Sequence, residues 1–282
     1  ALSQLDGAGD LADEGFRVPN AVYNKLKMQL KGGTIKGVHV RGRVSKDTKA
    51  TRESVLDPRT EMILFKMVQN GILAEVNGVS KQGKEASVFH ASAGSEVPPA
   101  LPQSAEGRQP TAVTDYAVKV FRTTLNEFSN RAEYFDGDPR FSYTKFSRQT
   151  GRKMYKLWAE KELRNLIRAY RAGLRVPQPF LQREHVLLME FVGEEGRSAP
   201  QLREMAFSDN GWQRCYVEMV ALVYMLFKCC SLVHGDLSEY NVLYHNKQLH
   251  LIDFGQAVDI SHPNHLELLV RDVDAINKFF RN

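Results

Sequence analysis

The sequence predicts an α+β protein organised as one two-lobed unit, with a helical extension ahead of it. Its 282 residues, 43% of them hydrophobic, can bury a substantial core. Short strand-like segments joined by turns occupy residues 72–121, whereas the longest helical patterns follow residue 152. Polar residues gather between residues 234 and 255, next to further strand signals, and this is where a site is expected.

The N-terminal residues show few signs of a packed core. Residues 1–14 are polar and are expected to be disordered, whereas residues 18–30 have the apolar spacing of a helix. Residues 31–52 are basic and contain several glycines. That composition suits contacts with RNA phosphates and suits a solvated connector equally well.

A second helix is predicted at residues 59–69. Asp57-Pro58 supplies an N-cap and a first-turn proline, and Asn70-Gly71 ends the helix. A short strand at 72–76 and a strand-turn-strand at 79–90 follow. At the turn, Gly83 would let the backbone approach phosphates, and further contacts could come from Lys81, Lys84 and Ser87.

Lys119 lies among apolar residues in a strand at 116–121. A lysine in such a place must find an anion or bear a desolvation cost, so we expect it to bind inner phosphates of a nucleotide. Its structural partner should be a glutamate on the helix predicted at 152–172. Glu160 and Glu162 both qualify, and Glu162 is preferred because it shares a face with Leu166. The buried stripe of this helix is predicted to contain Leu163, Leu166, Ile167 and Tyr170.

Two segments interrupt this region. Residues 92–115 are rich in Pro, Ser, Ala and Gly, which predicts a disordered insertion. Residues 122–153 alternate aromatic residues with Arg and Lys and are expected to form a flexible loop. This segment suits RNA binding, folding over a nucleotide, or an amphipathic helix packed on its own lobe.

A strand at 185–192 should lead into a hinge. The edge of a purine needs backbone donors and acceptors, which the Glu190 carbonyl and the Val192 amide could supply, with Met189 behind the base. The following helix, at 212–230, should form the core of the second lobe. The most apolar stretch, 216–233, contains Glu218 and Lys228 and is interpreted as a buried helix, not a membrane span.

The most specific pattern is His234-Gly-Asp236, with Asn241 five residues after the aspartate, followed by Asp253-Phe-Gly255. A loop at 238–240 and a hairpin turn at 245–247 should bring Asp236, Asn241 and Asp253 to one end. These groups suit phosphoryl transfer from ATP. Asp253 and the Asn241 oxygen would hold Mg²⁺, and Asp236 would accept or align the proton of the nucleophile. An accidental match to the combined pattern is improbable.

Charge and cysteine content set broader limits. There are 38 Lys and Arg against 33 Asp and Glu, a net charge of +5, which favours anionic partners without establishing nucleic-acid binding. The three cysteines form neither a disulfide framework nor a zinc pattern and are interpreted as core thiols in a reducing compartment. Without a visible targeting or membrane segment, a soluble protein of the cytoplasm or nucleus is expected.

In combination, several motifs resemble the RIO family of atypical protein kinases, over roughly residues 50–280. They are Gly83-Lys-Glu85, Ala117-Val-Lys119, Trp158-Ala-Glu-Lys-Glu162, the motif from His234 to Asn241, Ile252-Asp-Phe-Gly255 and His262-Pro263. Val55-Leu-Asp-Pro-Arg-Thr60 points to the type-one branch.

The resemblance implies a two-lobed protein-kinase-like fold whose small N-lobe contains an antiparallel sheet and whose helical C-lobe lacks an activation segment. The expected divisions are a tail and connector at 1–52, the helical extension at 53–78, the N-lobe at 79–189, and the hinge and C-lobe at 190–282. The short stretch after Asp253 agrees with a missing peptide-binding platform.

The resemblance also implies a function. The protein would be a serine/threonine kinase and ATPase using ATP with Mg²⁺ or Mn²⁺, and Asp253 would accept phosphate as an aspartyl phosphate. Its implied partners are the pre-small ribosomal subunit and its assembly factors, with pre-rRNA as a further contact. Two alternatives are a nucleotide-controlled assembly factor with little kinase activity and a small-molecule phosphotransferase, the latter disfavoured by the short C-terminal region.

The sequence departs from the family at the phosphate loop, where Lys81-Gln82 stand in place of the usual Ser-Thr. Hydroxyl contacts to phosphate are lost, so altered nucleotide affinity or turnover is expected. Phe254-Gly-Gln-Ala-Val258 replaces a Val-Ser-Gln-Ser-Val frequent in eukaryotic members, and the insertion at 92–115 is also unusual.

Overall fold

The computed structural model describes residues 57–83, 85–98, 111–122, 134–135, 137–141 and 151–281. The predictions for residues 1–56, for Lys84, for the middle of the Pro-rich insertion and for most of the segment 122–153 lie outside the described residues.

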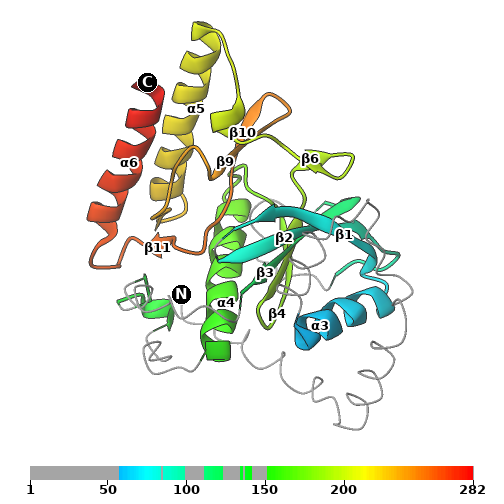
Figure 1. Ribbon diagram of the computed structural model, residues 1–282. Helices are drawn as coiled ribbons and strands as arrows, with labels where there is room; N and C mark the ends of the chain where they lie inside the picture. The colour runs from blue at the N-terminus through cyan, green and yellow to red at the C-terminus, as the bar shows by residue number, and fades with distance from the viewer. Residues whose placement is uncertain are drawn as a thin grey trace.

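A five-stranded antiparallel sheet forms the small lobe (Figure 1). Its spatial order is β1-β2-β3-β5-β4, with β1 at Leu73–Gln82, β2 at Ala86–Ala93, β3 at Asp115–Phe121, β4 at Pro179–Arg183 and β5 at Val186–Glu190. β1 starts well before residue 79, so residues 73–78, which the sequence analysis assigned to the extension, belong to the sheet. β4 was not predicted.

Helix α3 (Pro58–Gln69) covers one face of this sheet. Its N-cap Asp57 accepts hydrogen bonds from the backbone N–H groups of Arg59 and Thr60, as the Asp-Pro signal predicted. The apolar side of the helix packs on alternate residues of the strands; in β3 these are Tyr116, Val118 and Val120. The helical extension is therefore part of the N-lobe core.

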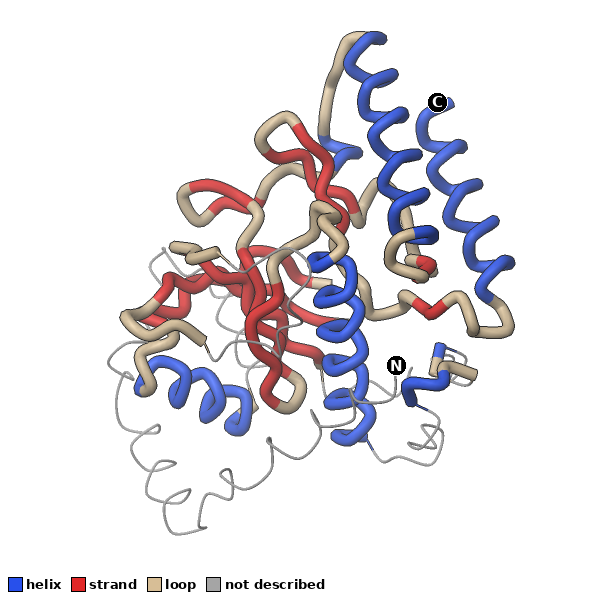
Figure 2. The backbone as a smooth tube through the Cα atoms, turned by 180° about the vertical axis from the view of Figure 1, so that it is seen from behind, coloured by secondary structure: helices blue, strands red, loops and turns tan. Residues whose placement is uncertain are grey.

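Helix α4 (Gly151–Arg171) lies across the opposite face of the sheet, which Figure 2 shows from behind. Strand alternation gives this face the other set of β3 residues, Ala117, Lys119 and Phe121. The predicted stripe of α4 was partly wrong, because Leu163 and Ile167 are only half-buried. Three polar residues are fully buried instead: Lys161, Glu162 and Asn165.

The larger lobe contains two long helices that lie side by side, α5 (Asp209–Lys228) and α6 (His265–Arg281) (Figures 1 and 2). The hairpin of β9 (Val242–His245) and β10 (Gln248–Leu251) lies beside α5, and the pair of β8 (Leu232–Val233) with β11 (Val258–Asp259) lies near the lower ends of the two helices in Figure 1. A small hairpin, β6 (Gly193–Glu194) with β7 (Arg197–Ser198), follows the hinge. Short 3-10 turns occur at Pro139–Phe141 and Leu202–Glu204. Only β11 and a turn separate Asp253 from α6, in keeping with the missing activation segment.

Helix α5 is less buried than predicted. Its core contacts come from Cys215, Met219, Leu222 and Leu226. Val217 and Tyr224 are 67% and 62% exposed, so the apolar stretch forms an amphipathic helix with some apolar residues outside. Cys229 is also exposed and is not the core thiol that was predicted, whereas Cys215 and Cys230 are buried. None of the described helices is long and apolar enough to cross a membrane.

The described residues of the segment before α4 pack on α4 and also reach the larger lobe, where Arg271 of α6 donates a hydrogen bond to the Tyr134 hydroxyl at 3.3 Å. Tyr134, Phe135 and Phe141 are buried, and Phe135 and Tyr134 contact the ring of Trp158 on α4. Of the interpretations offered by the sequence, the burial of these three side chains favours packing over a free surface, and Phe141 lies in the 3-10 turn at Pro139–Phe141.

Candidate active site

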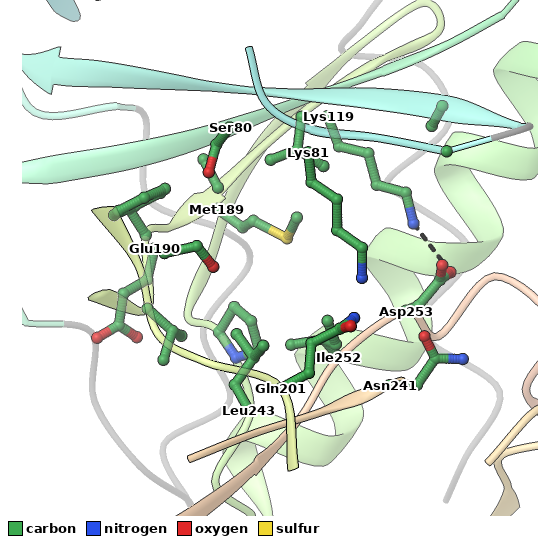
Figure 3. Close-up of a pocket in the computed structure, with 18 of the residues that line it drawn as sticks. Ser80, Lys81, Lys119, Met189, Glu190, Gln201, Asn241, Leu243, Ile252 and Asp253 are labelled. Atoms are coloured by element: carbon green, nitrogen blue, oxygen red, sulfur yellow. Dashed lines mark hydrogen bonds and ion pairs between the residues drawn. The ribbon is translucent and has the colours of Figure 1, made fainter. Parts of the chain in front are cut away.

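A cleft lies between the sheet and the β9–β10 hairpin (Figure 3). The sheet contributes residues of β1, β2 and β3, the hinge contributes Met189 to Val192, and the larger lobe contributes the motif residues. The lining includes Ser80, Lys81, Gly83, Glu85, Ala86, Val88, Ala117, Lys119, Met189, Glu190, Phe191, Val192, Ser198, Gln201, Asp236, Asn241, Leu243, Ile252 and Asp253. The three residues of the combined motif, Asp236, Asn241 and Asp253, therefore meet in one place.

Lys119 connects the two lobes inside this cleft. Its Nζ lies 2.8 Å from both carboxylate oxygens of Glu162 and 2.9 Å from Asp253 Oδ1. Lys119 reaches α4 because strand alternation points it to that face, and Glu162 is fully buried opposite it. Of the two candidate partners, the structure selects Glu162; Glu160 instead pairs with Arg164, one turn further along α4, at 2.6 Å.

The charges of this cluster are strongly coupled. Burial alone would lower the pKa of Lys119, but Asp253 and Glu162 outweigh it and raise that pKa above its ordinary value. Burial alone would raise the pKa of Asp253, yet Lys119 holds it below the usual value. For Glu162, burial is the stronger effect and raises the pKa to about 7. Lys119 and Asp253 are thus both held in their charged forms.

The segment after Asp253 is fixed by α4. Lys161 Nζ donates to the carbonyl oxygens of Ala257 at 2.5 Å and Gly255 at 3.2 Å. Asn165 Nδ2 donates to the carbonyl oxygens of Phe254 at 3.0 Å and Ala257 at 2.9 Å. These bonds satisfy carbonyls of the segment 254–257, of which Phe254 also accepts from the Ala257 N–H at 3.2 Å, so α4 positions both Lys119 and the chain that presents Asp253.

The loop containing Asp236 is held by α6. The carboxylate of Asp272 accepts hydrogen bonds from the backbone N–H groups of Gly235 and Leu237, at 2.8 and 2.9 Å, on either side of Asp236. Gly235 has a φ of +75°, a left-handed conformation that glycine adopts without strain. His234 Nε2 donates to the Ile252 carbonyl at 3.0 Å, which ties this loop to the residue before Asp253.

Asn241 faces the cleft beside Asp236. Its Nδ2 donates to the Asp236 carbonyl oxygen at 2.8 Å, which leaves the side-chain oxygen available as a ligand. Among the residues that the structure describes, the hydrogen-bond contacts of the Asp236 carboxylate are long, 3.4 Å to Asn241 Nδ2 and to Gln256 Nε2. Although Asp236 reaches solvent, partial desolvation by the surrounding protein raises its pKa, as suits a proton acceptor.

The donor set fits a magnesium ion bound together with a nucleotide. Asp253 and the Asn241 oxygen supply hard oxygen ligands in the same cleft, and Mg²⁺ commonly takes one or two protein ligands and completes its shell with phosphate and water. No cluster of three or more His, Cys, Asp or Glu that could hold a metal occurs in the described part of the chain.

The hinge residues occupy the far end of the cleft from Asp253 (Figure 3). Val192 accepts a hydrogen bond from Ala199 through its carbonyl, and its backbone N–H has no hydrogen-bond partner among the residues that the structure describes. Glu190 is fixed to Gln178 by two bonds, from its own N–H to the Gln178 carbonyl at 2.8 Å and from the Gln178 N–H to its carboxylate at 3.0 Å. Met189 also lines the cleft.

The predicted phosphate loop is only partly in the cleft. Gly83 lines it, and its N–H donates to the Ala86 carbonyl at 2.9 Å. Ser87 does not line it: the residue is fully buried, and its hydroxyl has no hydrogen-bond partner among the described residues. Strand alternation explains this, because Ala86 and Val88 face the cleft and Ser87, between them, faces α3. The prediction that Ser87 contacts phosphate was wrong.

Several residues that shape the site were not predicted, notably Asp272, Lys161, Asn165 and Gln201. For Asp272 a signal was available. It lies four residues from both Leu268 and Ile276, which are buried on the same face of α6, and a carboxylate on an apolar stripe needs a partner.

Comparisons with known proteins point to one kinase family. A family model described as the RIO domain matches residues 87–282. The serine/threonine-protein kinase rio1 of Dictyostelium discoideum is 39% identical over 95% of this chain and 43% of its own length. RIO3 of Bos taurus is 38% identical over 97% of this chain and 51% of its length, and RIO1 of Saccharomyces cerevisiae is 36% identical over 99% and 58%. The chain spans about half the length of these curated relatives.

The fold has a counterpart among solved structures. The Rio2 kinase from Chaetomium thermophilum, in an ADP/Mg²⁺-phosphoaspartate complex, aligns with a TM-score of 0.58 at 21% identity and covers 93% of this chain and 69% of that chain. Relatives of the RIO1 and RIO3 types match this chain to a similar extent. The family model matches more than half of the sequence, and the two-lobed kinase-like arrangement and the cleft motifs agree with that match. The chain therefore belongs to the RIO family.

Proposed function

We propose that this chain is the catalytic part of a serine/threonine protein kinase with ATPase activity that uses ATP and Mg²⁺. The observation that carries the proposal is that Lys119 Nζ lies within 2.9 Å of carboxylate oxygens of both Glu162 and Asp253, in the cleft that Asn241 and Asp236 also line. The names of the curated relatives support a kinase, and the ADP and Mg²⁺ bound to the Rio2 structure support the cofactors. Mn²⁺ would suit the same oxygen ligands.

Each residue has a role in this scheme. Val192 and the Glu190 carbonyl would hold the adenine edge, with Met189 behind the base, and Lys119, oriented by Glu162, would bind phosphates. Asn241 and Asp253 would hold the metal, which neutralises charge on the phosphates. Asp236 would take the proton from the attacking hydroxyl. Lys119 must exchange its bond to Asp253 for phosphate oxygens as the nucleotide and metal bind.

Asp253 also suits a second route. Its carboxylate oxygen would attack the γ-phosphorus, the bond between that phosphorus and the bridging oxygen of ADP would break, and ADP would leave with that electron pair. Water would then hydrolyse the acyl phosphate and release inorganic phosphate. The phosphoaspartate described for the Rio2 structure supports this route, which would make the protein a switch driven by ATP hydrolysis.

We further propose that the switch acts in late maturation of the small ribosomal subunit, in the cytoplasm with access to the nucleus. The pre-small subunit, its assembly factors and pre-rRNA would be the partners. Family membership and the net charge of +5 support this assignment. The short link from Asp253 to α6 favours a nucleotide-controlled binding factor with little trans-kinase activity as the second candidate, since peptide substrates would have little to dock on.

The test is incubation with γ-labelled ATP and Mg²⁺, following free phosphate, label on the protein and label on a generic protein acceptor. We expect free phosphate and a hydroxylamine-labile label, both lost in Asp253→Asn. The control Glu96→Gln removes one exposed carboxylate away from the cleft and should behave as wild type. Stable label on serine or on the acceptor would favour the direct kinase route, and unchanged turnover in Asp253→Asn would reject the site.

A further inference from the structure

We propose that Lys81 is a second cationic ligand for the nucleotide phosphates, which binds the outer end of the phosphate chain from the sheet side, opposite Asp253 and Asn241. The inference rests on the proposed function, because it requires a nucleotide in this cleft. It adds a determinant of specificity: the affinity of the site should rise with the number of phosphates even when no metal is present.

The direction of the Lys81 side chain depends on a β-bulge. In the pairing of β1 with β2, Val79 lies opposite Phe89 and Lys81 lies opposite Val88, so two steps along β1 correspond to one along β2. Val79 packs on the α3 side of the sheet with Phe89. In a regular strand Lys81, two residues later, would point to that same side. The bulge turns Lys81 to the opposite face, the one that lines the cleft.

The same register places Lys81 in one row with Lys119. Val88 of β2 pairs with Lys81 on one side and with Lys119 on the other. Residues directly opposite each other in antiparallel strands point to the same face, so both lysines and Val88 face the cleft. Figure 3 shows both lysine side chains extending from the sheet toward the side where Asp253 and Asn241 lie.

The two lysines differ in their partners. Lys119 is buried and bound to two carboxylates, Glu162 and Asp253. Lys81 is exposed to solvent at the cleft and has no hydrogen bond or ion pair with any residue that the structure describes. Partial desolvation lowers its pKa, Asp253 opposes that effect, and Lys119 adds to it. Lys81 is thus a cation that faces the cleft without an anion of its own.

A phosphate chain supplies the missing anion. In the proposed function the hinge would hold the base at one end of the cleft and Asn241 and Asp253 would hold the metal at the other, so the outer phosphates would lie near Asp253. A lysine ammonium is a compact point charge with three donors on a flexible stem, which can follow a phosphate group as it binds. Lys81 would neutralise charge from the sheet side while the metal does so from the side of Asn241.

The experiment is calorimetric titration with adenosine, AMP, ADP and ATP, each in Mg²⁺ and in EDTA. Lys81→Met removes the charge and keeps most of the stem, whereas Lys81→Arg keeps a charge. The control is Lys228→Met, at the exposed end of α5. It changes the net charge by the same amount as Lys81→Met, but at a position outside the cleft. We expect Lys81→Met to weaken ATP binding about tenfold, the size expected for one charge-assisted hydrogen bond. The loss should be smaller for ADP, absent for adenosine, and larger in EDTA.

The outcomes are distinguishable. Wild-type ATP affinity in Lys81→Met would overturn the inference while leaving the proposed function in place. An equal loss for adenosine and ATP would also overturn it, because the effect would then come from the shape of the cleft and not from phosphate. If wild-type protein binds none of the nucleotides, the proposed function fails and the inference with it. Near-wild-type ATP binding by Lys81→Arg would support a charge contact.

Discussion

At the scale of single residues, Asp253 combines an ion pair with an unusual backbone conformation. It bonds to Lys119 across the two lobes and has a φ of +65°, in the left-handed region that Asp and Asn tolerate better than most residues. The chain therefore turns sharply at the residue that must face the phosphates. Removing its charge and relaxing its backbone are separable changes.

Asp253→Asn and Asp253→Ala separate these effects. Both should nearly abolish ATP turnover, because each removes the carboxylate. Asn keeps a side chain suited to the left-handed region, so the alanine variant should be the less stable of the two by about 1 kcal/mol. Phosphate release and urea unfolding measure the two effects. Equal stability of the two variants would argue against strain at this position.

Asp236 offers a test through pH. Partial desolvation raises the folded pKa of Asp236 above its ordinary value, so ionised Asp236 costs stability at neutral pH, and the cost disappears as pH falls through the folded pKa. Asp236→Asn should therefore be more stable than wild type at pH 7, with the difference shrinking under acid, while turnover is lost. Urea unfolding from pH 7 to pH 4 checks this. A difference that grows as pH falls would contradict the raised pKa.

Sequence reasoning at this scale succeeded where chemistry restricts the choice. A lysine within an apolar strand needs an acid, and Glu162 was the candidate on the right face of α4. It failed where the detailed register of the backbone determines which face of the sheet a side chain points to. Neither the direction of Lys81, set by a bulge, nor the burial of Ser87 follows from residue type, because a shift of one residue in register reverses the face.

At the scale of elements, α4 serves both lobes. Glu162 faces Lys119 on the sheet, and one turn on either side of it Trp158 and Leu166 lie in the core shared with the larger lobe. Its polar residues Lys161 and Asn165 hold the chain after Asp253. A movement of this helix would displace the lysine partner and the metal aspartate together.

Asn165→Ala should expose this dependence. The change removes two donors to buried carbonyls and should cost about 1–3 kcal/mol of unfolding free energy. It should also lower turnover by loosening the segment 254–257. Arg164→Ala on the same helix removes the partly exposed pair with Glu160 and the contact with the Phe141 ring but no bond to the segment 254–257, and it serves as the control. Urea unfolding and hydrogen exchange over 254–257 are the measurements. If both variants lost the same unfolding free energy and the same protection from exchange over 254–257, Asn165 would have no special role in holding this segment.

Elements with strong local signals were predictable, and those that depend on distant partners were not. The β9–β10 turn matches its prediction, with Asn246 and Lys247 at φ values of 50° and 61°. β4 lacked such a signal, since Pro179–Arg183 is short and becomes a strand by pairing with β5. The exposed side of α5 was missed for a similar reason, because apolar content alone does not show which helix faces are covered.

At the scale of the whole molecule, the sheet separates two cores. One lies between the sheet and α3, and the other extends from α4 through the larger lobe. The cleft opens where the second core meets the hinge, so its two walls belong to different lobes. That the two walls come from different lobes was predicted, because the residues of the Asp236–Asn241–Asp253 motif come after the strands of the sheet in the sequence. That α3 completes the first core was not predicted.

β1 is an edge strand of the described sheet, and its pairing with β2 is interrupted repeatedly along its length. An edge strand with a regular row of free backbone groups can act as a template for another chain, and bulges disturb that row. The irregularity that turns Lys81 toward the cleft therefore also makes this border a poor docking place for a foreign strand. A variant with a regular β1 should form filaments or aggregates more readily, even where its cleft still binds nucleotide.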